Sequence, residues 1–194
     1  MRVIGITGGS GSGKTTLLEL IREMGGTVLD CDAIYHRLLQ EDNNLLRAID
    51  RRFPDCVEAG VLDRKKLGAI VFADPAALSA LNEITHTAVK AAVCKALEEK
   101  PALAAIDAIA LIESGLSDLC DVTVAVCAPK EERITRLTAR EHISADYAKA
   151  RIAAQKPDSW FRENCTYCLE NNGTSQQFRH KCLAFLQGLG IMIS

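Results

Sequence analysis

The stretch Gly8-Gly9-Ser10-Gly11-Ser12-Gly13-Lys14-Thr15 lies near the start of the chain and decides its fold class. It follows the apolar residues 3–6 and precedes a segment with helical periodicity, so it fits G-x-x-x-x-G-K-[ST] in the order strand, glycine loop, helix. Glycines let successive N–H groups point around a phosphate, and the start of the following helix adds positive potential. The stretch therefore predicts a nucleoside triphosphate site.

This prediction assigns roles to three side chains. Lys14 would reach the β- and γ-phosphates, and the Thr15 hydroxyl would hold Mg²⁺. Asp107 ends an apolar run, where a carboxylate can hold the same Mg²⁺ or its water. A simpler role for Asp107, bonding to nearby backbone at the end of a strand, remains open at this point.

Composition excludes several classes of protein. The chain has 194 residues, of which 48% are hydrophobic and 25% charged, with a net charge of −2. This composition is typical of a globular protein, and the charge argues against general binding to nucleic acid or to a membrane surface. No apolar run approaches the roughly 18 residues that span a bilayer. The first strand starts at once, so we expect no signal peptide and a cytoplasmic location.

Strands and helices alternate along the chain. The expected strands are residues 3–6, 27–29, 103–106, 122–126 and 167–169. The patterning of residues 33–100 and 130–155 predicts mainly helix. Such alternation predicts an α/β fold with a parallel five-stranded sheet wrapped by helices. The long helical segment suggests an inserted lobe at the carboxyl edge of the sheet, where ligands of such folds bind.

One helix of this lobe has a clear start. Asp74 is a good N-cap, and Pro75 suits the first helical position. The buried stripe that we expect on this helix is Leu78, Leu81, Ile84, Ala88, Ala92 and Ala96.

A kinase also needs a group that deprotonates the acceptor hydroxyl. Asp32 follows the second expected strand and is the candidate base, although it could instead cap the helix that begins there. Asp30 is more consistent with a structural role. The motifs D-x-x-G and N-K-x-D are absent from the sequence, which makes a regulatory GTPase a poor interpretation.

Four arginines lie in the helical segment 130–155. Arg133, Arg136, Arg140 and Arg151 are mostly expected on solvated helix faces. A basic flap that closes on phosphate oxygens would still suit phosphoryl transfer, and Arg140 is the first candidate for that role.

The chain has eight cysteines. Without an export signal, a disulfide framework is not expected. Cys165 and Cys168 form a C-x-x-C that could bind zinc together with His180 and Cys182, but no second C-x-x-C supports this site, and we expect no zinc.

Taken together, several stretches make the chain similar to the dephospho-CoA kinase family. They are the residues 4–15, Val28-Leu29-Asp30-Cys31-Asp32, Leu62-Asp63-Arg64, Val71-Phe72-Ala73-Asp74-Pro75, Ile84-Thr85-His86, Glu113-Ser114-Gly115-Leu116, Arg151-Ile152-Ala153-Ala154-Gln155 and Asn171-Asn172-Gly173. They span nearly the whole chain in the expected order. The sequence departs from the family pattern at Thr87 and Ile109, where the family usually has proline, and at Glu170, where it has aspartate.

The resemblance implies ATP-dependent phosphorylation of the ribose 3′-hydroxyl of dephospho-coenzyme A, giving coenzyme A and ADP, the last step of CoA synthesis. It implies Lys14, Asp32 and Arg140 as catalytic residues, with Asp32 as base and Arg140 on a lid. The implied ATP-binding residues are Gly11, Ser12, Gly13, Lys14, Thr15, Thr16, Asn172 and Gly173.

The resemblance also implies a nucleoside-monophosphate-kinase-like P-loop fold. Its core would comprise residues 1–32, 101–129 and 156–194, with a helical CoA lobe at about 33–100 and a lid at about 130–155. The expected partners are ATP with Mg²⁺ and dephospho-CoA, and we expect a monomer. A kinase of another nucleoside or alcohol, and an ATP-binding regulator without turnover, are the alternatives; the intact Lys14, Thr15, Asp32 and Arg140 argue against the regulator.

Overall fold

The structure is a computed structural model that describes residues 1–191. The chain divides into two compact units, which are described separately below. The first unit consists of Met1–Leu29 and the chain from Lys100 onwards, and the second is Asp30–Glu99. Asp32, expected at the end of the core, therefore belongs to the second unit.

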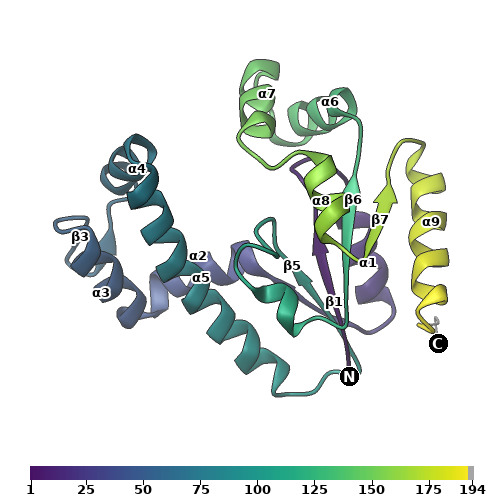
Figure 1. Cartoon of the computed structure of the whole chain (residues 1–194), viewed down its shortest axis with the longest axis horizontal. Helices are drawn as coiled ribbons and strands as arrows, with labels where there is room; N and C mark the ends of the chain where they lie inside the picture. The colour runs from purple at the N-terminus through teal and green to yellow at the C-terminus, as the bar shows by residue number, and fades with distance from the viewer. Residues whose placement is uncertain (192–194) are drawn as a thin grey trace. The chain divides into compact units, whose positions relative to one another are not determined.

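The first unit is built on a five-stranded sheet (Figure 1). Its strands are β1 (Arg2–Thr7), β2 (Thr27–Asp30), β5 (Leu103–Asp107), β6 (Val122–Cys127) and β7 (Tyr167–Glu170), in the order β2-β5-β1-β6-β7. Strand β1 runs parallel to both β5 and β6, and β6 runs parallel to β7. The predicted α/β fold with a parallel five-stranded sheet is confirmed.

Helices cover both faces of this sheet. The helices of the first unit are α1 (Lys14–Glu23), α6 (Lys130–Glu141), α7 (Ala145–Ala153), α8 (Asp158–Asn164) and α9 (Ser175–Gly188), with a 3₁₀ turn at Leu116–Leu119. On one face, Leu17 of α1 and Phe178 of α9 pack on Ile4 of β1 in the main apolar core. On the other face, Phe161 of α8 packs on Ala125 and Cys127 of β6. This burial of apolar surface fixes the carboxyl edge of the sheet, where the site lies.

The second unit contains four helices and a short hairpin. Its elements are α2 (Cys31–Glu41), α3 (Asn43–Arg52), β3 (Val57–Glu58), β4 (Val61–Leu62), α4 (Arg64–Ala73) and α5 (Pro75–Leu97). Each helix begins after an aspartate whose carboxylate accepts backbone N–H bonds: Asp30, Asp42, Asp63 and Asp74. Such caps supply partners that the first helical turn lacks. Ile49, Phe53 and Leu67 belong to this unit's own apolar core.

The predicted stripe of α5 is wrong in its register. The fully buried positions are Ala77, Val89, Val93 and Leu97, whereas Leu78 is 37% exposed. Leu81, Ile84 and Ala88 are partly buried against the core of this unit. The helix is rich in alanine on several sides, so its sequence alone does not single out one face. The predicted start at Asp74 and Pro75 is confirmed.

Within residues 1–191, no helix has the length and apolar character needed to cross a membrane.

Candidate active site

Residues 8–13 form the turn between β1 and α1. Gly11 has φ +78° and Gly13 has φ +100°, a region of backbone space that glycine adopts without strain. The N–H of Ser12 donates to the carbonyl of Gly9 at 3.1 Å, which closes the turn. No side chain caps the start of α1. The N–H groups of its first turn therefore suit an anion, as the sequence predicted.

Lys14 and Asp107 lie together beside this turn. The Lys14 Nζ donates to the carbonyl of Gly8 at 3.0 Å and lies 3.9 Å from Asp107 Oδ1. Asp107 is the last residue of β5, and its pairing with Ile6 of β1 brings it to the same edge of the sheet. The structure thus joins a cation and a carboxylate, 93 positions apart in sequence (107 − 14), at the mouth of the loop.

Thr15 and Asp107 were the residues predicted to hold Mg²⁺. A hydroxyl and a carboxylate offer the hard oxygen ligands that Mg²⁺ prefers. Among residues 1–191, no group of three or more His, Cys, Asp or Glu side chains could hold a metal. Mg²⁺ characteristically takes few protein ligands and fills its octahedron with water and phosphate oxygens, so this donor set fits it.

The expectation of a solvated side chain is wrong for Arg133, and Arg136 is only partly exposed. Arg133 is only 4% exposed, and its Nε donates to the carbonyl of Ser10 at 2.9 Å. Arg136 Nη1 lies 3.4 Å from the carbonyl of Gly11 and 3.3 Å from that of Ser12. Helical periodicity placed both on a polar face, but that face of α6 contacts the phosphate-binding turn.

Arg140 lies at the exposed end of the same helix. It pairs with Glu141, which also pairs with Arg151 of α7. The Arg140 side chain is 60% exposed. Hydrogen bonds from Arg140 and Arg151 lower the pKa of Glu141, so this carboxylate is charged and holds both guanidinium groups. A small apolar cluster of Leu137, Ala148 and Ile152 packs α6 against α7.

The two aspartates after β2 have different positions. Asp30 is the N-cap of α2, and its Oδ1 accepts from the N–H of Ala33 at 3.0 Å. Asp32 is exposed in the first turn of α2. The alternative that Asp32 caps the helix is therefore wrong, and the structural interpretation of Asp30 is confirmed.

The family model for dephospho-CoA kinase matches residues 2–177. The chain belongs to this family. A dephospho-CoA kinase of Thermus thermophilus is 37% identical over 188 residues, covering 96% of this chain and 91% of the relative. One from Anaeromyxobacter dehalogenans is 38% identical over 201 residues, covering 97% and 93%. Family membership makes the chain a nucleotide-binding phosphotransferase.

Solved structures agree with this assignment. The crystal structure of TT1252 from Thermus thermophilus has a TM-score of 0.83 and 35% identity, with 97% of each chain covered. A dephospho-CoA kinase from Campylobacter jejuni, at 24% identity and a TM-score of 0.67, covers 99% of this chain and 100% of its own. A shikimate kinase from Bacteroides thetaiotaomicron, at 13% identity and a TM-score of 0.59, covers 97% and 98%. The last two support the P-loop kinase fold.

Asn171 has a role in this kinase that the sequence did not reveal. It is 5% exposed, and its Nδ2 donates to the carbonyl of Ser12 at 2.8 Å. A Cβ on Gly13 would lie 2.2 Å from the same nitrogen. The resemblance implied that residues 171–173 form a turn near the adenine, but Asn171 itself contacts the phosphate-binding turn.

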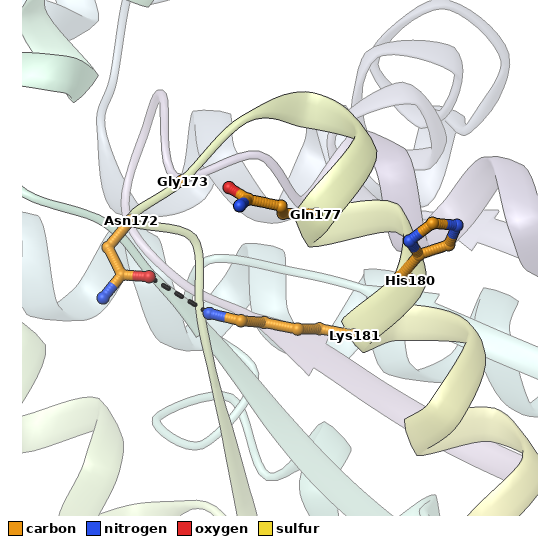
Figure 2. Close-up of a pocket in the computed structure, with 5 residues that line it drawn as sticks. All are labelled: Asn172, Gly173, Gln177, His180 and Lys181. Atoms are coloured by element: carbon orange, nitrogen blue, oxygen red, sulfur yellow. Dashed lines mark hydrogen bonds between the residues drawn. The ribbon is translucent and has the colours of Figure 1, made fainter.

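Asn172 and Gly173 line an open hollow of about 440 Å³ on the first unit. Figure 2 shows that Gln177, His180 and Lys181 of α9 complete its lining. The Lys181 Nζ donates to Asn172 Oδ1 at 3.1 Å and to the carbonyl of Glu170 at 2.9 Å. Thr174 and Gln177 form a capping box that fixes the start of α9 beside this hollow.

The departures from the family pattern lie in ordinary surroundings. Glu170 ends β7 and pairs with Arg162 of α8. Thr87 lies on α5 and donates to the carbonyl of Glu83 at 2.8 Å. The carbonyl of Ile109 accepts from the Thr7 hydroxyl at 3.0 Å. Each of these three residues thus has a local structural partner.

The C-x-x-C residues lie near a third thiol. Cys168 Sγ is 3.4 Å from Cys127 Sγ, on the neighbouring strand β6. Cys182, one of the four residues considered for zinc, is buried in the main apolar core. His180 lines the hollow beside α9.

Proposed function

We propose that Lys14, Asp32 and Arg140 are the catalytic residues for transfer of the ATP γ-phosphoryl group to the ribose 3′-hydroxyl of dephospho-coenzyme A. The chain is a kinase of the family that carries out this reaction, the final step of CoA biosynthesis. The products are coenzyme A and ADP. The observation that carries the proposal is the pairing of Lys14 with Asp107 beside a glycine turn whose helix has no side-chain cap.

ATP binds, in this proposal, with its phosphates in the turn. The backbone of residues 11–16 surrounds the β- and γ-phosphates, and Lys14 offsets their charge. The hollow beside Asn172 and Gly173 accommodates the adenine. Its position next to Asn171, which contacts Ser12, supports this direction for the nucleotide.

Thr15 and Asp107 would hold Mg²⁺, and the bound ion would supply positive charge that offsets the negative charge of the phosphates. Lys14 would also offset the phosphate charge, because its ammonium group contacts phosphate in both the ground state and the transition state.

Asp32 acts as the general base that takes the proton from the 3′-hydroxyl. Its carboxylate is exposed, and Asp30 serves the helix as cap, so Asp32 is not needed for local structure. Arg140 acts from the lid, residues 130–155, by exchanging Glu141 for phosphate oxygens when the lid closes. In this proposal residues 33–100 form the lobe that takes the CoA substrate, and residues 1–32, 101–129 and 156–194 form the core.

We further propose that the kinase is a cytoplasmic monomer that binds neither nucleic acid nor membrane. A net charge of −2 supports the absence of a general polyanion-binding surface.

The direct test is a coupled assay of ADP release with ATP and dephospho-CoA, run beside a panel of nucleosides and simple alcohols. We expect turnover with dephospho-CoA far above that with any other acceptor. Lys14→Ala should lose both ATP affinity and rate, whereas Arg179→Gln, which removes a surface pair with Glu23, should behave as wild type. Preferred turnover of another acceptor would replace the proposed substrate. ATP binding without turnover of any acceptor would favour a regulator.

A further inference from the structure

We propose that Arg133 is a positioning residue for ATP binding, which holds the phosphate-binding turn in its working shape from behind. Arg133 lies near the start of α6, and its side chain binds Ser10, Gln155 and Asp158. Nothing in the family resemblance assigned it a role. The inference rests on the proposed function only in taking ATP as the ligand of the turn.

Arg133 is a buried cation with three partners. It is 4% exposed; besides the Ser10 carbonyl, its Nη1 donates to Asp158 Oδ1 at 3.1 Å and its Nη2 to Gln155 Oε1 at 3.0 Å. Burial lowers the pKa of Arg133, and Asp158 opposes this shift. A guanidinium remains charged in proteins, and an unpaired buried charge is costly. Its orientation is therefore fixed by these partners.

The carbonyl, the backbone N–H and the hydroxyl of Ser10 each form a hydrogen bond with a side chain from outside the turn. Its carbonyl accepts from Arg133, and its N–H donates to Gln155 Oε1 at 2.9 Å. Its hydroxyl accepts from Gln155 Nε2 at 2.7 Å. Gln155 thus contacts Ser10 twice and Arg133 once, so the three residues form a closed network. The peptide groups on both sides of Ser10 are oriented by side chains from outside the turn.

Arg133 lies so close to Gly9 and Gly11 that neither position has room for a side chain. A Cβ on Gly9 would lie 2.0 Å from Arg133 Nη2, and a Cβ on Gly11 would lie 2.7 Å from the Arg133 carbonyl. The general motif requires glycine at neither position, since both fall among its variable residues. The close approach of Arg133 explains the glycine at position 9, and at position 11 it adds to the requirement set by φ +78°.

The network accounts for a functional effect beyond stability. Outward-facing carbonyls of the turn are bound from behind by Arg133, Arg136 and Asn171, which turns the neighbouring N–H groups toward the phosphate side. A turn shaped in advance binds its anion without a further ordering cost. Loss of Arg133 should therefore weaken the bound triphosphate even in protein that remains folded.

The test measures the affinity of a non-hydrolysable ATP analogue by titration calorimetry, together with steady-state kinetics. For Arg133→Gln, we expect a Kd and a KM for ATP raised on the order of 10- to 100-fold, the size expected when a charged hydrogen bond is lost. The KM for dephospho-CoA should change little. Arg133→Lys keeps the charge but not the forked donors, so it should restore affinity only in part. Arg179→Gln is the matched arginine control.

A purely structural role gives a different result. In that case Arg133→Gln would lower the melting temperature while the folded fraction bound the analogue with the wild-type Kd, and this outcome would overturn the proposal. If Arg133→Gln does not fold, Gln155→Ala tests the same network from its other side and should also raise the Kd. A wild-type Kd in Gln155→Ala would then reject it. Because the readout is ATP affinity, failure of the wild type to phosphorylate dephospho-CoA would be seen separately.

Discussion

The side-chain amide of Asn171 donates to the carbonyl of Ser12, and this hydrogen bond links residues 159 positions apart in sequence. The backbone N–H of Asn171 also donates to the carbonyl of Cys127 at 2.8 Å. One residue thus connects the end of β6, the segment after β7 and the phosphate-binding turn.

Asn171→Ala should weaken ATP binding by about tenfold, because a buried carbonyl loses its donor and the turn loses a fixed point. Titration with a non-hydrolysable ATP analogue measures the change. Asn164→Ala, which removes an exposed bond to the carbonyl of Trp160, is the control and should leave affinity unchanged. Equal affinities for Asn171→Ala and wild type would show that this contact does not shape the turn.

Asp32→Asn should lower kcat on the order of 10²–10⁴-fold while ATP affinity stays near that of wild type, as loss of a general base predicts. Asp30→Asn is a matched control two residues away. Asparagine caps helices as well as aspartate does, so this variant should keep both fold and rate. Near-normal turnover in Asp32→Asn would remove Asp32 from the mechanism.

Arg140→Ala should reduce kcat much more than ATP affinity, because its contact matters most in the transition state. In wild type, hydrogen exchange across residues 130–155 should slow when an ATP analogue and dephospho-CoA bind together. Lys149→Ala, which removes an exposed pair with Asp146, serves as the control within the same segment. Exchange that is slow without ligands and insensitive to them would contradict a mobile lid.

Glu141 should make the stability of the segment 130–155 depend on pH. Its pKa is held below the usual 4.5 by Arg140 and Arg151, so its stabilising contribution is present above that value and is lost as pH falls through the lower pKa of the folded state. Wild type should melt about 1–3 °C above Glu141→Gln at pH 7, since partly exposed pairs contribute little, and this difference should be smaller at pH 3. A difference that is the same at both pH values would contradict this pairing.

The thiols should differ widely in reactivity. Cys94 is exposed, whereas burial raises the pKa of Cys120 and of Cys182 to about 12. Because the thiolate is the reactive form, brief treatment with iodoacetamide at pH 7.5 should label Cys94 first. Peptide mass spectrometry reads out the sites, and unfolding in guanidinium, where all eight cysteines should react, is the control. Early labelling of Cys182 would contradict its burial.

Sequence patterns were sufficient to predict the sheet and the part of the site that contains Lys14 and Asp107. Strands such as β5 and β6 are continuous apolar runs, and the residue that ends β5, Asp107, lies at the edge where parallel strands place ligands. Its proximity to Lys14 follows from strand pairing that a βαβ pattern already implies.

The residues behind the turn could not be found in this way. Arg133 and Asn171 act through partners 123 and 159 positions away, and such contacts leave no local period in the sequence. Arg133 also occupies a helix whose other charged residues are all at least partly exposed. The signal that was present is indirect: Gly9 exceeds what the motif requires and has no conformational need for glycine, which indicates a close neighbour. The hairpin β3–β4 was missed because each strand has only two residues.

Arg133 and Gln155 also bracket the segment between them, since both bind Ser10. Both ends of the segment 133–155 are therefore anchored at Ser10, whatever the number of residues between them. The entropy of closing a loop grows only slowly with its length, by about 0.6 kcal/mol per doubling. Insertions or deletions near His142, where the backbone turns with φ +54° between α6 and α7, would leave the anchor unchanged. The segment between Arg133 and Gln155 can thus vary in length, and extend over a different distance, without altering how the nucleotide is held.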